Sequence, residues 1–252
     1  MNGGMMDESA LVMESRFVDD GIARLVLEAP GIAAECRPGQ FAMLEPSPGA
    51  FPVTRRPLTF SGCDRSAGTI SFLFDVVGKG TSLLSEASPG DRIRLLGPLG
   101  RGYDITPGRW LLIAGGMGAA GFPFLLSRTG GGLVLAGMRS SRGIGCLPAG
   151  SRLATEDGSA GVRGLVTDLL VDIDWDAFDS VAVCGPAPMM KAVVLAAPRS
   201  AAHRIQVSME SGMGCGWGAC GGCPVPSSGG GYLSCCKDGP VFRADCIDWE
   251  RV

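Results

Sequence analysis

Cys215-Gly-Trp-Gly-Ala-Cys220-Gly-Gly-Cys223 is the stretch of this sequence that decides the fold, and Cys235-Cys236 follows twelve residues later. Read as C-x4-C-x2-C…C, the spacing is typical of a plant-type 2Fe-2S cluster, in which four thiolates hold two irons. Six glycines between residues 212 and 222 leave room for backbone N–H groups to turn toward the cluster sulfurs. The sequence therefore predicts a loop that wraps an iron-sulfur cluster.

Two other uses of these cysteines stay open. Four thiolates also suit a structural zinc ion, although zinc sites usually pair their ligands as two short C-x2-4-C knuckles, unlike the spacing here. Disulfides are disfavoured because the opening residues, Met-Asn-Gly-Gly-Met-Met-Asp, lack the basic and apolar regions of a secretory signal. We therefore expect a cytoplasmic protein whose cysteine cluster binds metal.

The composition restricts the class of protein. The 252 residues allow two small domains and a short module that a metal stabilises, and a hydrophobic content of 46% is enough for a core. The net charge is −3, and the 22 basic residues do not cluster, so nucleic acid is a poor candidate partner. No apolar run approaches the roughly 20 residues of a membrane-spanning helix, so we expect no membrane partner.

The first part of the chain, residues 1–104, consists of short β-rich runs that Pro and Gly interrupt. Several such runs with turn signals between them predict a small antiparallel β-barrel. The runs are Arg24–Glu28, Gly39–Leu44, Arg56–Ser61, Thr69–Val77 and Arg92–Leu96.

The pattern changes to alternating strands and helices over residues 105–208, and the cluster module occupies residues 209–252. Alternation of this kind predicts a parallel sheet with helices on both faces. The expected strands are Trp110–Ala114, Leu133–Gly137, Val181–Cys184 and Arg204–Met209, and the expected helices lie near Ala119–Arg128, Val166–Leu170 and Pro188–Ala197. The predicted fold is thus a multi-domain β plus α/β chain.

Two stretches of the barrel are suited to binding phosphate. Arg55-Arg56-Pro57-Leu58-Thr59 places a guanidinium and a hydroxyl on one strand, and a guanidinium binds oxyanions bidentately, although a plain surface Arg pair is an equal alternative. Val77-Gly78-Lys79-Gly80-Thr81-Ser82 runs from a strand into a helix whose free N–H groups would attract an anion, with Thr81 or Ser82 as cap. The P-loop spacing is absent, which argues against nucleotide hydrolysis.

Two turns of the α/β part are candidate nucleotide sites. Gly115-Gly116-Met117-Gly118 follows the first strand and begins a literal G-x-G-x-x-G, but the acid expected about 20 residues later is missing. A tight connection without ligand is the alternative. Cys184-Gly185-Pro186 follows a later strand, at the edge where open α/β sheets bind ligands.

The choice between NAD and NADP depends on charges near the ribose. Arg139 and Arg142 follow the second strand and would suit a 2′-phosphate, whereas Glu156 and Asp157 follow the next strand and would repel it. The two positions disagree, so these residues alone leave the choice between NAD and NADP open.

These motifs in this order resemble the ferredoxin-reductase-like family, and within it the electron-transfer subunits of two-subunit, NAD-linked dihydroorotate dehydrogenases. The resemblance covers nearly the whole chain and is most specific from Met209-Glu210 through the cysteine loop to Cys236-Lys-Asp-Gly-Pro-Val-Phe242. Two departures are the bulky Gly121-Phe-Pro-Phe124 and the double cysteine at 235–236.

The resemblance implies a role for each motif. FAD would be held by Arg56, Pro57, Leu58, Thr59, Gly78, Lys79, Gly80 and Thr81, with Arg56 on its pyrophosphate and Thr59 near its ring. NAD would be held by Gly115, Gly116, Gly118, Cys184, Gly185 and Pro186. The 2Fe-2S ligands would be Cys215, Cys220, Cys223 and Cys236, with Cys235 as a neighbour only.

The implied function is electron transfer between NAD and a catalytic flavoprotein subunit that oxidises dihydroorotate in pyrimidine biosynthesis, in a heterotetramer of two subunit types. Such an electron-transfer chain needs a flavin, because hydride carries two electrons whereas a 2Fe-2S cluster carries one, and a flavin can exchange both. One alternative keeps the wiring but serves ferredoxin, a hydrogenase or another NAD(P)-linked oxidoreductase. Another is a zinc-stabilised binding protein without redox activity.

Overall fold

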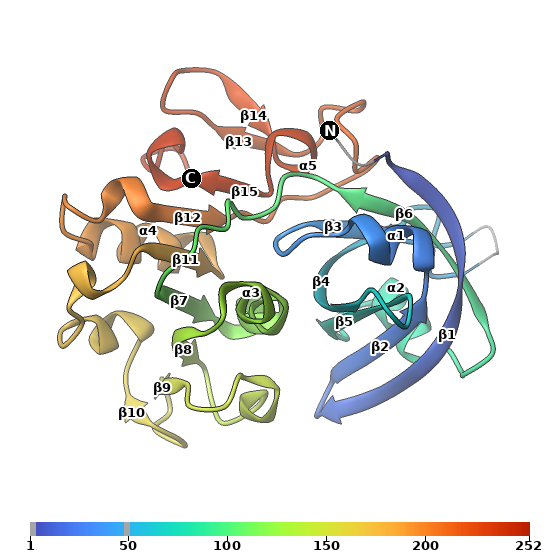
Figure 1. Ribbon diagram of the computed structural model, residues 1–252, viewed down its shortest axis with the longest axis horizontal. Coiled ribbons are helices and arrows are strands. Elements are labelled where there is room, and N and C mark those ends of the chain that lie inside the picture. The colour runs from blue at the N-terminus through green and yellow to red at the C-terminus, as the bar shows by residue number, and fades with distance from the viewer. Residues whose placement is uncertain (1–3, 48–50) are drawn as a thin grey trace.

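The computed structural model describes residues 4–47 and 51–252, so residues 1–3 of the predicted barrel and the segment 48–50 lie outside it. Strands of the first hundred residues form one barrel, the following strands form an open sheet, and the C-terminal residues pack across one end of both (Figure 1). This arrangement confirms the predicted fold class of barrel, α/β domain and C-terminal module.

The barrel is closed in the order β1-β2-β5-β4-β3-β6, with antiparallel pairing throughout. Alternating residues point inward, as in β5, where Ile70, Phe72 and Phe74 are buried and their neighbours are half-buried. The strands are β1 (Met6–Asp19), β2 (Ile22–Glu28), β3 (Phe41–Leu44), β4 (Arg56–Asp64), β5 (Thr69–Asp75) and β6 (Arg92–Leu99), and the helices are α1 (Pro30–Glu35) and α2 (Lys79–Ser85).

The second domain is a sheet in the order β10-β9-β8-β7-β11-β12-β15, parallel except at β15. Every residue of its central strand β7 is buried, as expected for a strand covered on both faces. The strands are β7 (Trp110–Gly115), β8 (Gly132–Met138), β9 (Arg152–Thr155), β10 (Val162–Arg163), β11 (Ser180–Cys184) and β12 (Ile205–Ser208). The α-helices are α3 (Phe122–Thr129) and α4 (Ala187–Ala196). Helix α3 faces the barrel (Figure 1).

Two predicted helices differ in type. The segment after β7 begins as the 3-10 helix η1 (Gly116–Gly121), and only from Phe122 does it become α-helical. Residues Val166–Leu170 form the 3-10 helix η3, which the Asp168 carboxylate stabilises by accepting a hydrogen bond from the Leu165 N–H at 2.7 Å. Glycine-rich and short segments lack the residues that sustain an α-helix, which explains both differences. The remaining 3-10 turns are η2 (Ile144–Cys146), η4 (Trp175–Ala177), η5 (Ala202–Arg204) and η6 (Ala244–Cys246).

The C-terminal module is joined to the rest by a strand and by the core. It contains β13 (Pro224–Pro226), β14 (Tyr232–Ser234), α5 (Cys235–Asp238) and β15 (Val241–Arg243). Strand β15 pairs antiparallel with β12, so the sheet crosses the predicted boundary between residues 208 and 209. One apolar cluster contains Met43 of the barrel, Ile113 of the sheet and Cys223 of the module.

Candidate cofactor-binding site

The four predicted cluster cysteines form two pairs of thiols. Cys223 Sγ lies 3.2 Å from Cys236 Sγ. Cys215 and Cys220 form the second pair, because the Cys220 thiol hydrogen-bonds to Cys215. Two thiolates per iron are what a 2Fe-2S cluster takes, since bridging sulfides occupy the other two positions on each iron. Within residues 4–47 and 51–252, no three His, Cys, Asp or Glu side chains converge as ligands of one metal ion.

Backbone N–H groups of the loop point at the sulfurs. The Gly218 N–H donates to Cys236 Sγ at 3.1 Å, and the Cys236 N–H donates to Cys223 Sγ at 3.4 Å. Burial raises the pKa of the Cys215 thiol, but donors led by the Trp217 and Cys220 N–H groups outweigh it and bring that pKa to about 6. Thiolate is the form that binds iron, so the loop fits the predicted cluster.

Cys235 differs from its neighbour Cys236. Its Sγ is buried and donates to the Met209 carbonyl at 3.3 Å, within the core that joins the module to the sheet. Burial, with Cys223 nearby, raises the pKa of the Cys235 thiol to about 12. Burial likewise raises the pKa of the Cys236 thiol to about 12, so the two cysteines differ in their contacts and not in their pKa. Cys236 Sγ lies 3.2 Å from Cys223 Sγ and accepts from the Gly218 N–H, so Cys236 stays our predicted fourth ligand.

The two predicted flavin stretches are brought together by the barrel. The guanidinium of Arg56 lies over Gly80 at the start of α2, since a Cβ built on Gly80 would come 2.8 Å from the Arg56 Cζ. Arg56 Nη1 donates to the Thr54 carbonyl at 2.8 Å and to the Thr54 hydroxyl at 2.7 Å, which orients the planar group. A Cβ on Gly78 would meet no atom within 4 Å, so the backbone before α2 has open space in front of it.

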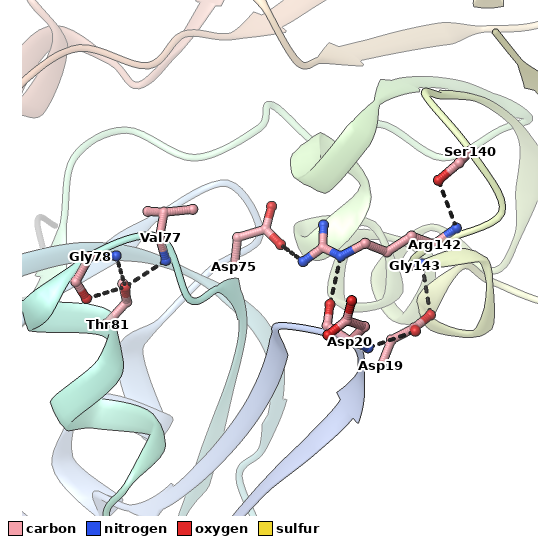
Figure 2. Close-up of polar contacts among 9 residues, drawn as sticks. All are labelled: Asp19, Asp20, Asp75, Val77, Gly78, Thr81, Ser140, Arg142 and Gly143. Carbon is pink, nitrogen blue, oxygen red and sulfur yellow. Dashed lines mark hydrogen bonds and ion pairs between the residues drawn. The ribbon is translucent and has the colours of Figure 1, made fainter. Parts of the chain in front are cut away.

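Thr81 occupies the third position of α2 rather than the cap position, which Gly78 takes. Its hydroxyl accepts hydrogen bonds from the Val77 and Gly78 N–H groups, at 3.0 and 3.1 Å (Figure 2). The next N–H groups, of Lys79 and Gly80, belong to the first turn, where an α-helix leaves its donors without intrahelical partners. A guanidinium beside free N–H donors fits the pyrophosphate of FAD.

The two predicted nucleotide turns also lie together. Strands β7 and β11 are adjacent and parallel, so Gly115 and Cys184 end at the same edge of the sheet. A Cβ on Gly118 would clash with the Cys184 carbonyl and come 2.8 Å from the Gly185 nitrogen. Gly116, with φ +54°, has no atom within 4 Å of an added Cβ. The contact requires glycine, and the open space leaves room for a dinucleotide.

The flavin strand touches both other candidate sites. Thr59 on β4 contacts the nucleotide turn, because a Cβ on Gly121 would lie 3.2 Å from the Thr59 methyl. On the other side, a Cβ on Gly216 of the cysteine loop would lie 2.5 Å from Met43 Cγ. Met43 is the cross-strand partner of Pro57. Strands β3 and β4 therefore connect the three sites.

Arg142 has partners in the barrel that the sequence does not reveal. Its Nη2 donates to Asp75 at 2.6 Å and its Nε donates to the Asp20 carbonyl at 2.6 Å, while Asp19 accepts from the Gly143 N–H at 2.7 Å (Figure 2). The guanidinium is thus engaged between the domains, with its hydrogen-bond partners in the barrel. Turn residues at 19–20 and 140–143 carry no pattern that predicts this contact.

Comparisons with known proteins agree with this geometry. The chain is 38% identical to the dihydroorotate dehydrogenase B (NAD(+)) electron transfer subunit of Desulforamulus reducens, over 88% of this chain and 91% of that protein. It is 36% identical to the homologous protein of Aquifex aeolicus, over 93% of this chain and 95% of that protein. It belongs to the family of dihydroorotate dehydrogenase B electron-transfer subunits.

Membership in the dihydroorotate dehydrogenase B family is reinforced by two further matches. Residues 210–248 match the iron-sulfur cluster binding domain of dihydroorotate dehydrogenase B. A solved structure of an NADH-dependent reduced ferredoxin-NADP oxidoreductase superposes with TM-score 0.79 at 28% identity, covering 96% of this chain and 90% of that chain. None of the helices in the described residues combines the length and apolar character that crossing a bilayer requires.

Proposed function

We propose that this chain transfers electrons between NAD and the catalytic flavoprotein subunit of a dihydroorotate dehydrogenase, in pyrimidine biosynthesis. The observation that carries the proposal is the position of β3 and β4. Met43 contacts the cysteine loop, its partner strand carries Arg56 to Thr59, and Thr59 contacts the nucleotide turn at Gly121. Adjacent strands are about 4.8 Å apart, so the three sites meet at one wall.

The chain's residues bind and orient three redox groups. When bound, FAD links the two-electron hydride of NAD(H) to the one-electron 2Fe-2S cluster. Arg56 and the first turn of α2 would hold the FAD pyrophosphate, and Gly115 to Gly118 with Cys184 to Pro186 would hold the dinucleotide.

The cysteine loop would supply the cluster ligands and the surface for the partner subunit. In this proposal the iron ligands are Cys215, Cys220, Cys223 and Cys236. Hydrogen bonds from the N–H groups of the loop would stabilise the negative charge on their sulfurs. Cys220 is exposed and Trp217 is 49% exposed, so this end of the chain is open to a partner. A complex of two subunit types in the cytoplasm remains our prediction.

The proposal is tested by composition and by activity. We expect purified protein to be yellow-brown and to contain two irons, two labile sulfides and one FAD per chain. With its catalytic subunit, it should reduce NAD with dihydroorotate, and the catalytic subunit alone should not. A colourless protein that binds stoichiometric zinc would contradict the proposal and favour the non-redox alternative.

A second candidate function keeps the same electron-transfer pathway through FAD and the cluster but has a different redox partner. The likeness to the NADH-dependent reduced ferredoxin-NADP oxidoreductase, at 28% identity over 96% of this chain, favours it. If reduced ferredoxin reduces NAD through the purified protein, while dihydroorotate with the catalytic subunit does not, the second candidate replaces the first.

A further inference from the structure

A cleft of about 460 Å³ lies between the barrel and the nucleotide-binding domain, and three arginines line it. Arg37 follows α1, and Arg65 lies in the turn between β4 and β5, so both belong to the barrel. Arg128 lies in the last turn of α3, in the other domain. The residues 103–106 that link the two domains also line the cleft.

The cleft is distinct from the proposed cofactor sites. Arg65 follows the end of β4, nine residues after Arg56, and an extended strand covers about 30 Å in that length. Helix α3 runs back from the edge where β7 ends, so Arg128 lies toward the edge where the parallel strands begin. Nucleotides bind at the opposite edge in open α/β sheets.

The charge of the cleft is unbalanced. Among the ion pairs of the described residues, none includes Arg37, Arg65 or Arg128; the Arg128 guanidinium lies over the Phe124 ring, 5.4 Å from its centroid. Asp104 also lines the cleft, but it pairs with Arg101 at 3.4 Å. Three guanidinium groups around one space give it a local excess of positive charge, which an anion lying between them would neutralise.

The thiol of Cys63, beside the cleft, is affected by arginines of both domains. The thiol of Cys63 has its pKa lowered to about 7, first by a hydrogen bond from Cys36 and then by the charges of Arg128 and Arg65. Cys36 itself lines the cleft. The positive field of the two domains therefore overlaps in this region.

The floor of the cleft is held in place. The Asp104 N–H donates to Gln206 Oε1 at 2.8 Å, and Gln206 Nε2 donates back to the Asp104 carbonyl at 3.0 Å. The Thr106 and Ser180 hydroxyls are 2.8 Å apart, and the buried Tyr103 packs edge-on to Trp110. The linker is thus a rigid surface, which reduces the entropy lost when a ligand binds.

We propose that this cleft binds a small polyanion, with two or more negative charges on phosphate or carboxylate groups, that bridges Arg37 and Arg65 of the barrel to Arg128 of α3. A guanidinium binds either oxyanion through two parallel hydrogen bonds. The cleft volume lies in the range of small-molecule sites, about 300–1,000 Å³, so an anion of pyrophosphate or citrate size fits.

The test is calorimetric titration of the intact protein with its cofactors, saturated with NAD so that the nucleotide turns are filled. Inorganic pyrophosphate and citrate are titrated separately at matched ionic strength, and at least one should bind saturably at one site per chain. The tighter of the two assigns the ligand to phosphates or to polycarboxylates. No saturable binding of either anion up to about 10 mM would overturn the proposal.

Variants separate the cleft from general charge effects. Arg37→Gln, Arg65→Gln and Arg128→Gln should each weaken binding by about 5-fold or more, since each removes a charge-assisted contact. Asp104→Asn should strengthen it, and Arg199→Gln, an exposed arginine after α4, should leave it unchanged. Binding that Arg128→Gln does not weaken, or that Arg199→Gln weakens equally, would overturn the proposal.

Discussion

Replacing Gly80 by alanine tests whether the Arg56 guanidinium must lie over the start of α2. A Cβ at Gly80 would come 2.8 Å from Arg56 Cζ and 3.0 Å from Nη2, closer than side-chain atoms pack. The obstructing atoms are the far end of a flexible side chain, so Arg56 can swing away and the fold should persist. The variant therefore moves the guanidinium without removing its charge.

The expected loss is in flavin affinity. A displaced guanidinium forfeits one charge-assisted contact with the FAD pyrophosphate, about 1.5–3 kcal/mol, which corresponds to about 10- to 100-fold in Kd. It also leaves its hydrogen bonds to the Thr54 carbonyl and hydroxyl. Alanine favours a helix over glycine by up to about 1 kcal/mol, so the stability of α2 should not fall. FAD affinity is thus expected to fall while the stability of the fold is maintained.

The assay measures FAD retained after dialysis and the Kd for FAD from its fluorescence on release. Gly229→Ala is the matched control, because a Cβ there meets only Ser227 Oγ at 3.7 Å, far along the chain in the β13 to β14 turn. Arg56→Ala should reproduce the loss. If Gly80→Ala retains FAD as well as the unmodified protein while Arg56→Ala loses it, the guanidinium reaches the pyrophosphate from another position and our placement is wrong.

Three further predictions concern the other parts of the site. Cys235→Ser should keep two irons per chain and Cys236→Ser should lose the cluster on iron analysis; the reverse result would mean that the register is one residue out. The side chains of Arg142 and Asp75 are 42% and 31% exposed, so a double-mutant cycle on the free energy of unfolding in urea should give a coupling of only about 0.5–1 kcal/mol. Salt at about 1 M should remove this coupling, and no coupling at low salt would contradict the contact. NADH should bleach the flavin with much higher kcat/KM than NADPH in stopped flow, because Arg142 is held by the barrel and acids follow β9; equal rates would mean that a basic group faces the ribose.

The sequence predicts those parts of the fold whose pattern is local. Strand β5 alternates apolar and polar residues, and β7 is a continuous apolar run, so both are recognisable from period and length. Strand β1 is missed because only Ala10 and Val12 of its 14 residues are buried, and its apolar residues at 10–13 are consecutive, so the sequence shows no alternation of apolar and polar residues. Strand β15 is missed because three residues gain their stability from pairing with β12, far away in sequence.

The candidate site likewise has parts that a local sequence pattern predicts and parts that depend on contacts between distant residues. Ligand spacing and glycine-rich turns are local signals, so the cysteine loop and the Gly115 turn are predictable from sequence. The contact of Gly80 with Arg56 joins residues 24 apart, and the contact of Arg142 with Asp75 joins residues 67 apart. Such contacts are decided by barrel closure and domain packing, and no motif predicts them.

The contact between Gly216 and Met43 explains why the cysteine loop has glycine at a position that ligates nothing. Gly216 has φ +88°, which disfavours any side chain, and an added Cβ would also lie 2.5 Å from Met43 Cγ. A side chain there would push the loop away from β3 and so from the strand that carries Arg56 and Thr59. Since electrons in our proposal pass between these two places, we infer that the backbone conformation and the close approach of the loop to the barrel, rather than cluster ligation, require glycine at this position.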